Sequence, residues 1–123
     1  TDAGGVVYYA NYLKFAERAR TEALRAVGLE QAVLKEQEDL LFVVRSVSVD
    51  YRKPARLDDC LTITTHLTDS GAASLTLAQR ILRGEEVLAE LGVRLAAVDS
   101  GLRPKRLPPH ITDALSRAFA SGS

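Results

Sequence analysis

The 123-residue sequence predicts an α+β fold in which a long helix lies on one face of an antiparallel sheet. Three observations lead to this prediction. The first part of the chain repeats its apolar residues with a helical period, the middle part alternates apolar and polar residues, and short turn sequences separate the alternating segments. Strands joined by tight turns form antiparallel sheets, and a preceding amphipathic helix then covers one face.

The helix is predicted over residues 10–27, where apolar residues recur at steps of three and four. Gly28 follows at the position where a left-handed residue ends a helix. A short second helix is expected over residues 30–38. The apolar stripe consists of Tyr12, Phe15, Ala16, Ala19, Ala23, Leu24 and Val27, and the opposite, polar side holds most of Lys14, Glu17, Arg18, Arg20, Glu22 and Arg25.

Strands are expected over residues 41–51, 61–67, 74–82 and 87–97, with turns at 69–71, 83–85 and 99–101. In the first strand, one parity holds Leu41, Val43, Val47, Val49 and Tyr51. Residues 101–110 are predicted to form a loop and residues 112–120 a short helix. No repeat or linker interrupts the pattern, so we expect a single domain over residues 1–123.

Composition and charge favour a soluble cytoplasmic domain. Apolar residues make up 46% and charged residues 26% of the chain, and sixteen basic residues balance sixteen acidic ones. This balance gives no support to nucleic-acid binding. No apolar stretch approaches the roughly 18 residues that cross a bilayer, so no integral membrane segment is expected. The single cysteine, Cys60, excludes an intrachain disulfide and favours a reducing compartment.

Most familiar catalytic signatures are absent from the sequence. It contains no G-x-S-x-G elbow, Walker loop or G-x-G-x-x-G fingerprint. His66 and His110 are not spaced as metal ligands, so we expect no metal; His66 is expected half-exposed on its strand and His110 at the start of the last helix. Cys60 is expected to be a buried or half-buried thiol, and the Glu85-Glu86 pair a solvated turn.

The opening stretch TDAGGVVYYANYLKF is the strongest candidate for a site. Gly4 and Gly5 permit a ligand to approach bare backbone. The helix that begins near Tyr9 or Ala10 has unpaired N–H groups at its head, which can polarise a carbonyl oxygen. Asp2 lies seven residues before Tyr9. A carboxylate beside a polarising helix end is a minimal set for acyl transfer; alternatively, Asp2 caps a turn and the glycines only shape the loop.

Several stretches of the chain resemble one enzyme family. TDAGGVVYYANYLKFAERARTEALRAVGL, VDYRKPARLDDCLTI, QRILRGEEVLAELGVRLAAVD and GLRPKRLP are similar, in this order, to the hotdog-fold acyl-CoA thioesterases of the 4-hydroxybenzoyl-CoA thioesterase group. Within that group the chain is most similar to the bacterial acyl-CoA thioesterases associated with the Tol–Pal system. The resemblance covers nearly the whole chain.

The resemblance implies a long helix wrapped by a curved antiparallel sheet, with active sites at the interface of a homodimer or a dimer of dimers. It implies that the first strand precedes Thr1. In the family's D-x-D-x-x-G-x-V motif, the second and catalytic aspartate corresponds to Asp2, and the N–H that polarises the thioester carbonyl corresponds to Tyr9. No cofactor is expected, since coenzyme A is part of the substrate.

The sequence departs from the family at several positions. The motif's first aspartate would precede Thr1, and Tyr9 stands where the Tol–Pal branch has a histidine and the hydroxybenzoyl branch a tyrosine. The hydroxybenzoyl branch's basic triplet for coenzyme A phosphates is replaced by Gly71-Ala72-Ala73. The alternative candidates for phosphate binding, each also explicable as a solvated loop residue, are Arg52, Lys53, Arg103, Lys105 and Arg106.

Hydrolysis of acyl-CoA to a carboxylic acid and free coenzyme A is therefore the expected activity. Asp2 would attack the carbonyl or act as general base on a water, and the sequence leaves both routes open. A non-catalytic acyl-CoA-binding or assembly module remains an alternative; a hydratase would need a histidine on the loop. The acyl slot is expected to include Gly4, Gly5, Val6, Val7 and Tyr8.

Overall fold

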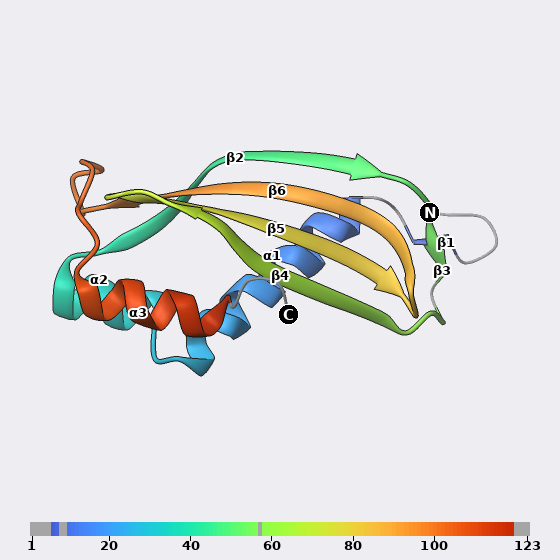
Figure 1. Cartoon of the computed structure of the whole chain (residues 1–123), viewed down its shortest axis with the longest axis horizontal. Coiled ribbons are helices and arrows are strands. Elements are labelled where there is room, and N and C mark those ends of the chain that lie inside the picture. Colours follow the sequence, from blue (N-terminus) through green and yellow to red (C-terminus); the bar gives the residue numbers. More distant parts are fainter. Residues whose placement is uncertain (1–5, 8–9, 57, 120–123) are drawn as a thin grey trace.

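In the described part of the chain, four long strands form one curved antiparallel sheet, and the longest helix lies along one of its faces (Figure 1). The structure, a computed structural model, describes residues 6–7, 10–56 and 58–119. The strands are neighbours in the order β2 (Leu41–Tyr51), β6 (Glu86–Val98), β5 (Ser74–Arg83) and β4 (Leu61–Ser70). All adjacent pairs are antiparallel, which confirms the predicted α+β class.

The long helix α1 (Ala10–Ala26) is held on the sheet by its apolar stripe. Tyr12 and Ala16 are completely buried, and Leu24 is nearly so. Gly28 has a φ of 81°, a left-handed conformation that most side chains avoid, and it ends the helix as predicted. The predicted short second helix is α2 (Gln31–Glu38).

The last helix, α3 (Pro109–Ala118), packs against α1 and starts earlier than predicted. Pro109 stands in its first turn, where the missing N–H of proline costs no hydrogen bond. Ile111, Ala114 and Leu115 are its buried residues. The predicted helix extended to Ala120, which lies outside the described residues.

A bulge in β2 makes the predicted face of this strand wrong for Leu41 and Val43. The register with β6 shifts between Val44 and Ser46, so that Arg45 is the extra residue. Before the bulge, Phe42 lies opposite Ala97, and after it Val47 lies opposite Val93. Ala97 and Val93 are both fully buried. A one-residue bulge exchanges the two faces of a strand, so Phe42, rather than Val43, joins the core.

Two short strands were not predicted. β1 (Val6–Val7) pairs antiparallel with β3 (Ala55–Arg56), with Val7 opposite Ala55. Two residues are too few to show the alternation that identifies a strand in a sequence. This two-stranded ribbon lies beyond the end of β2 (Figure 1). Its strand β1 is the described element that comes before α1 in the sequence.

The hairpin turns and the lone thiol differ in detail from the predictions. Asp69 and Ser70 still belong to β4, so that turn lies at residues 71–73, two residues later than expected, whereas Gly84, with a φ of 64°, forms the predicted β5–β6 turn. Cys60 is exposed, so the expected burial of its thiol is wrong. The residue lies in the connection just before β4 and not on the inward face of a strand.

Candidate functional site

Of the predicted catalytic residues, Asp2 precedes β1 in the sequence and Tyr9 lies between β1 and α1 in the sequence. Asp2, Gly4, Gly5, Tyr8 and Tyr9 lie outside the described residues. β1 ends at Val7 and α1 begins at Ala10, so the described elements bracket Tyr8 and Tyr9 on both sides. The contacts that hold β1 and the first turn of α1 therefore bear on the predicted site.

The segment that connects β2 to β3 fixes both elements. The N–H groups of Arg52 and Lys53 donate to the carbonyl oxygen of Leu88, at 2.9 and 3.0 Å. The hydroxyl of Tyr12, in the first turn of α1, donates to the carbonyl oxygen of Lys53 at 2.9 Å. Ala55 is completely buried and pairs with β1. The head of α1 and the strand before it are thus tied to the same segment.

Asp59 anchors β3 to the β5–β6 hairpin. One of its carboxylate oxygens accepts the N–H of Arg56 at 2.7 Å and a guanidinium N–H of Arg83 at 2.8 Å. The bond from the Arg56 N–H, followed by that from Arg83, lowers the pKa of Asp59. Arg83 also pairs with Glu86 at 2.7 Å. Asp59 therefore stabilises β3, and through the pairing of β3 with β1 it also stabilises β1.

The same cluster corrects the prediction for Glu86. This residue begins β6 and does not form part of a solvated turn; its carboxylate pairs with Lys53 and Arg83. Hydrogen bonds from Lys53 and then from Arg83 lower the pKa of Glu86. Only Glu85 of the predicted pair lies in the turn.

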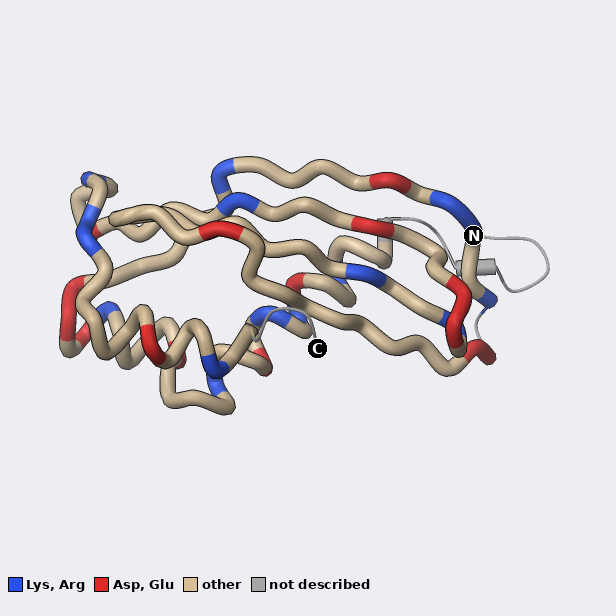
Figure 2. The backbone as a smooth tube through the Cα atoms, viewed as in Figure 1, with Lys and Arg blue, Asp and Glu red and all other residues tan. Residues whose placement is uncertain are grey.

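The two groups of candidate phosphate ligands lie at opposite ends of the sheet. Arg52 and Lys53 follow β2 near the β1–β3 ribbon, whereas the loop with Arg103 and Lys105 follows β6 at the far end (Figures 1 and 2). Arg52 pairs with Asp50 and Glu90. The ammonium group of Lys105 donates to the carbonyl oxygen of Glu38. Phosphate binding by these residues stays a prediction, since a phosphate would have to replace or join these partners.

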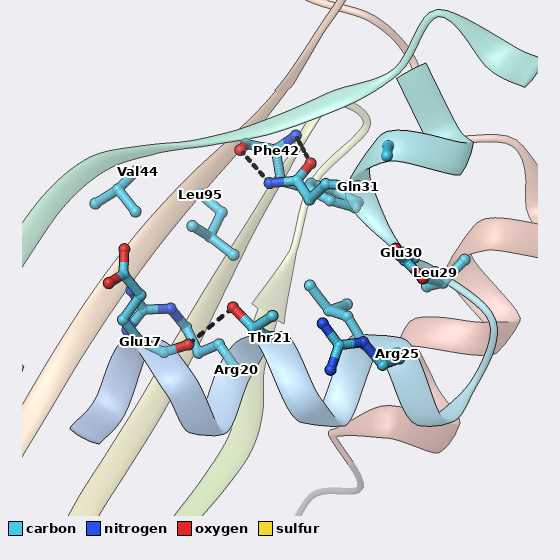
Figure 3. Close-up of a pocket in the computed structure, with 12 residues that line it drawn as sticks. Glu17, Arg20, Thr21, Arg25, Leu29, Glu30, Gln31, Phe42, Val44 and Leu95 are labelled. Atoms are coloured by element: carbon cyan, nitrogen blue, oxygen red, sulfur yellow. Dashed lines mark hydrogen bonds between the residues drawn. The ribbon is translucent and has the colours of Figure 1, made fainter. Parts of the chain in front are cut away.

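A pocket of about 360 Å³ opens between α1, α2 and the start of β2 (Figure 3). Its apolar lining includes Leu24, Phe42, Val44 and Leu95. Gln31, at the start of α2, closes one end by exchanging two hydrogen bonds of 3.1 Å with the backbone of Phe42. The pocket is therefore mainly apolar, with polar groups at its margins.

Arg20 is a cationic residue of this pocket that the sequence pattern placed on the polar side of the helix. Its side chain is instead half-buried, and burial lowers the pKa of its guanidinium. It donates to the amide oxygen of Gln79 at 2.8 Å. Gln79 is only 1% exposed, and it occupies the inward parity of β5 between Leu77 and Ile81. A polar residue at that parity was a signal that could have revealed the pair.

Neither histidine takes part in this arrangement. His66 is half-exposed on β4, as predicted. His110 lies in the first turn of α3, also as predicted, and its Nε2 is 2.8 Å from the carboxylate of Glu38. Among the described residues, no three histidine, cysteine or acidic side chains gather as a metal-binding group.

Sequence comparison identifies the family. Residues 4–90 match the model of the thioesterase superfamily. The chain belongs to the thioesterase superfamily. It is 42% identical over 115 residues to the acyl-CoA thioesterase YbgC of Haemophilus influenzae, covering 93% of this chain and 85% of that protein. It is 47% identical over 113 residues to the acyl-CoA thioester hydrolase YbgC of Escherichia coli O157:H7, covering 90% and 84%.

The fold agrees with this thioesterase membership. A probable thioesterase from Bartonella henselae superimposes with a TM-score of 0.79 at 40% identity, covering 87% of this chain and 89% of that one. The predicted hotdog fold, a long helix wrapped by a curved antiparallel sheet, is confirmed. None of the helices in the described residues combines the length and the apolar character needed to span a membrane.

Proposed function

We propose that this chain hydrolyses acyl-CoA thioesters to a carboxylic acid and free coenzyme A. The similarity to two named acyl-CoA thioester hydrolases along nine-tenths of the chain carries this proposal. The rigid mounting of β1 and the head of α1 supports it, because a polarising N–H group is useful only where it is held in place before the substrate arrives.

The chemistry is assigned to two residues on either side of β1 in the sequence, Asp2 before it and Tyr9 between it and α1. The thioester carbonyl would accept a hydrogen bond from the Tyr9 N–H, at the positive end of the helix dipole. The Asp2 carboxylate would attack the carbonyl carbon to form an anhydride that water then opens, or it would take a proton from the attacking water. Either route ends with the acyl group on oxygen and the proton on the coenzyme A sulfur.

A homodimer would complete this site. β2 is an edge strand whose Val44, Val47 and Tyr51 are 48%, 40% and 38% exposed, and Leu13 of α1 is 41% exposed. Antiparallel pairing of two β2 edges about a two-fold axis would cover this surface. It would also bring the Arg52–Lys53 end of one copy toward the Arg103–Lys105 loop of the other, so both groups could contact one coenzyme A.

We also propose a cytoplasmic location. An exposed thiol such as that of Cys60 is compatible with a reducing compartment, where disulfides rarely form. No cofactor is proposed, because the carboxylate, the helix end and water suffice for hydrolysis.

The test is release of thiol from a panel of aromatic, short-chain and long-chain acyl-CoAs by the purified chain. Wild type should release coenzyme A from at least one substrate. Asp2→Asn should lower kcat by about three orders of magnitude, since it removes the nucleophile or base. Asp113→Asn, which changes an exposed aspartate on α3, is the matched control and should keep near wild-type turnover.

Two outcomes would reject this assignment. Binding of acyl-CoA without thiol release by wild type would instead support a non-catalytic binding module. Near wild-type turnover by Asp2→Asn would mean that the chain is a hydrolase but that Asp2 is neither its nucleophile nor its general base.

A further inference from the structure

The pocket between α1 and β2 contains a cation that protein groups hold but do not saturate. A guanidinium has five N–H donors, and the hydrogen bond to Gln79 uses one of them. Arg25, which lines the same pocket, is exposed and pairs with Glu22 at 2.8 Å. Arg20 thus differs from its neighbour in being half-buried and in having a neutral acceptor as its described hydrogen-bond partner.

Gln79 holds this guanidinium in a defined direction. Its amide nitrogen donates to the carbonyl oxygen of Ala16 and to the hydroxyl of Thr65, both at 3.0 Å. These two bonds orient the amide and leave its oxygen for Arg20. Gln79 therefore positions the guanidinium of Arg20 at the pocket.

We propose that this pocket receives the far end of the acyl group and that Arg20 hydrogen-bonds an oxygen atom carried there, from a hydroxyl or a carboxylate. The inference rests on the proposed thioesterase function. Leu24, Phe42 and Leu95 would contact the methylene groups of the chain. Glu17 and Glu30 line the margin and are exposed, and the charge of Glu17 offsets only part of the effect of burial on the pKa of Arg20.

The distance suits a chain of medium length. Arg20 follows Ala10, the first residue of α1, by ten residues, which is about 15 Å along a helix axis at 1.5 Å per residue. Helical side chains lean toward the N-terminus, so the guanidinium returns part of that distance. With carbon–carbon bonds of about 1.5 Å, a chain of about eight carbons spans the remainder.

The experiment compares octanoyl-CoA with 8-hydroxyoctanoyl-CoA and 7-carboxyheptanoyl-CoA. For wild type, kcat/KM should be about tenfold higher for at least one oxygenated substrate than for octanoyl-CoA, the value of one well-placed hydrogen bond to a charged group. Arg20→Met should remove this preference, so that kcat/KM of this variant is equal for the three substrates. Arg25→Met, the matched control in the same pocket, should keep the preference.

Equal kcat/KM for all three substrates in wild type would overturn the proposal without any variant. An unchanged preference in Arg20→Met would also overturn it. If no acyl-CoA is hydrolysed, the proposed function fails first. Calorimetric binding of non-hydrolysable thioether analogues of the same three compounds then tests the pocket by itself, with the same expected difference between wild type and Arg20→Met.

Discussion

Gln79 illustrates how much of this fold depends on a few buried polar contacts. Its amide is 1% exposed and joins Ala16 of α1, Thr65 of β4 and Arg20 in one network. The network links the helix to two strands at the centre of the core. Buried polar groups are costly once their partners are removed, so the three residues should behave as a unit.

Gln79→Leu should lower the free energy of unfolding by about 2 kcal/mol, because Arg20 loses its acceptor while still half-buried. The double variant Arg20→Met/Gln79→Leu should recover most of that loss, since no cation is then left without a partner. Urea denaturation of wild type, Arg20→Met, Gln79→Leu and the double variant measures the coupling free energy between the two side chains. Additive losses in the double variant would contradict the network.

Asp59 gives the β1–β3 ribbon a pH dependence. Its pKa is lowered in the folded chain, first by the bond from the Arg56 N–H and then by that from Arg83. A carboxylate with a lowered folded-state pKa stabilises the fold fully above its ordinary pKa of 3.8. This stabilisation is lost as the pH falls from there through the lowered value.

Asp59→Ala should therefore be less stable than wild type at pH 7, and the difference should begin to shrink as the pH falls below the ordinary aspartate pKa toward the lowered one. Thermal unfolding measured between pH 7 and pH 3 provides the comparison. Asp58→Ala, at the neighbouring exposed position, is the control and should change little. A difference between wild type and Asp59→Ala that persists unchanged at pH 3 would show that the carboxylate charge is irrelevant.

Sequence reasoning reached some of these residues and missed others for identifiable reasons. The stretch containing Asp2 and Tyr9 was found through its glycines, its carboxylate and the helix that follows. Arg20 was missed because helical periodicity assigns charged residues to solvent, although a long side chain can reach inward. The bond between Arg83 and Asp59 spans 24 positions of the chain, and no local pattern predicts it.

At the scale of elements, the bulge at Arg45 decides which half of β2 faces the core. The run Leu41 to Val44 is apolar at every position, so alternation cannot choose a face there. The register with β6 places Phe42 inward and Val43 outward. The long helix and the four long strands were predictable because each repeats its period several times, whereas β1 and β3 are too short to show one.

Phe42→Ala should destabilise the fold by about 3 kcal/mol, because it empties a buried position beside Ala97. Val43→Ala should cost much less, since this side chain is only half-buried. Chemical denaturation of the two variants compares the two faces directly. The reverse order of stability would mean that the strand keeps one parity throughout.

At the scale of the whole molecule, the β2 edge of the sheet is suited to pairing with a second copy of the chain. β2 is eleven residues long, ends the sheet and exposes Val44 and Val47. Isolated apolar residues at a surface are ordinary, but these lie together along a free strand edge. The proposed dimer accounts for them.

Val44→Glu/Val47→Lys should convert the assembly to monomers without unfolding it, because both positions are already exposed. Light scattering coupled to size-exclusion chromatography gives the mass, which decides this prediction; turnover does not, because Val44 also lines the pocket. Leu102→Gln, which changes a 70% exposed residue in the loop after β6, should leave the mass unchanged. A wild-type monomer at micromolar concentration would remove the shared site.

The exposed sulfur of Cys60 bears on how any of this chemistry is observed. It is the sole cysteine of the chain and lies close in sequence to the ribbon that carries the proposed site. Colorimetric reagents that count liberated mercaptans will also titrate the enzyme itself, one equivalent per polypeptide. Cys60→Ser removes that background, and in the parent chain the same sulfur offers a single attachment point for a fluorescent reporter in the connection between β3 and β4.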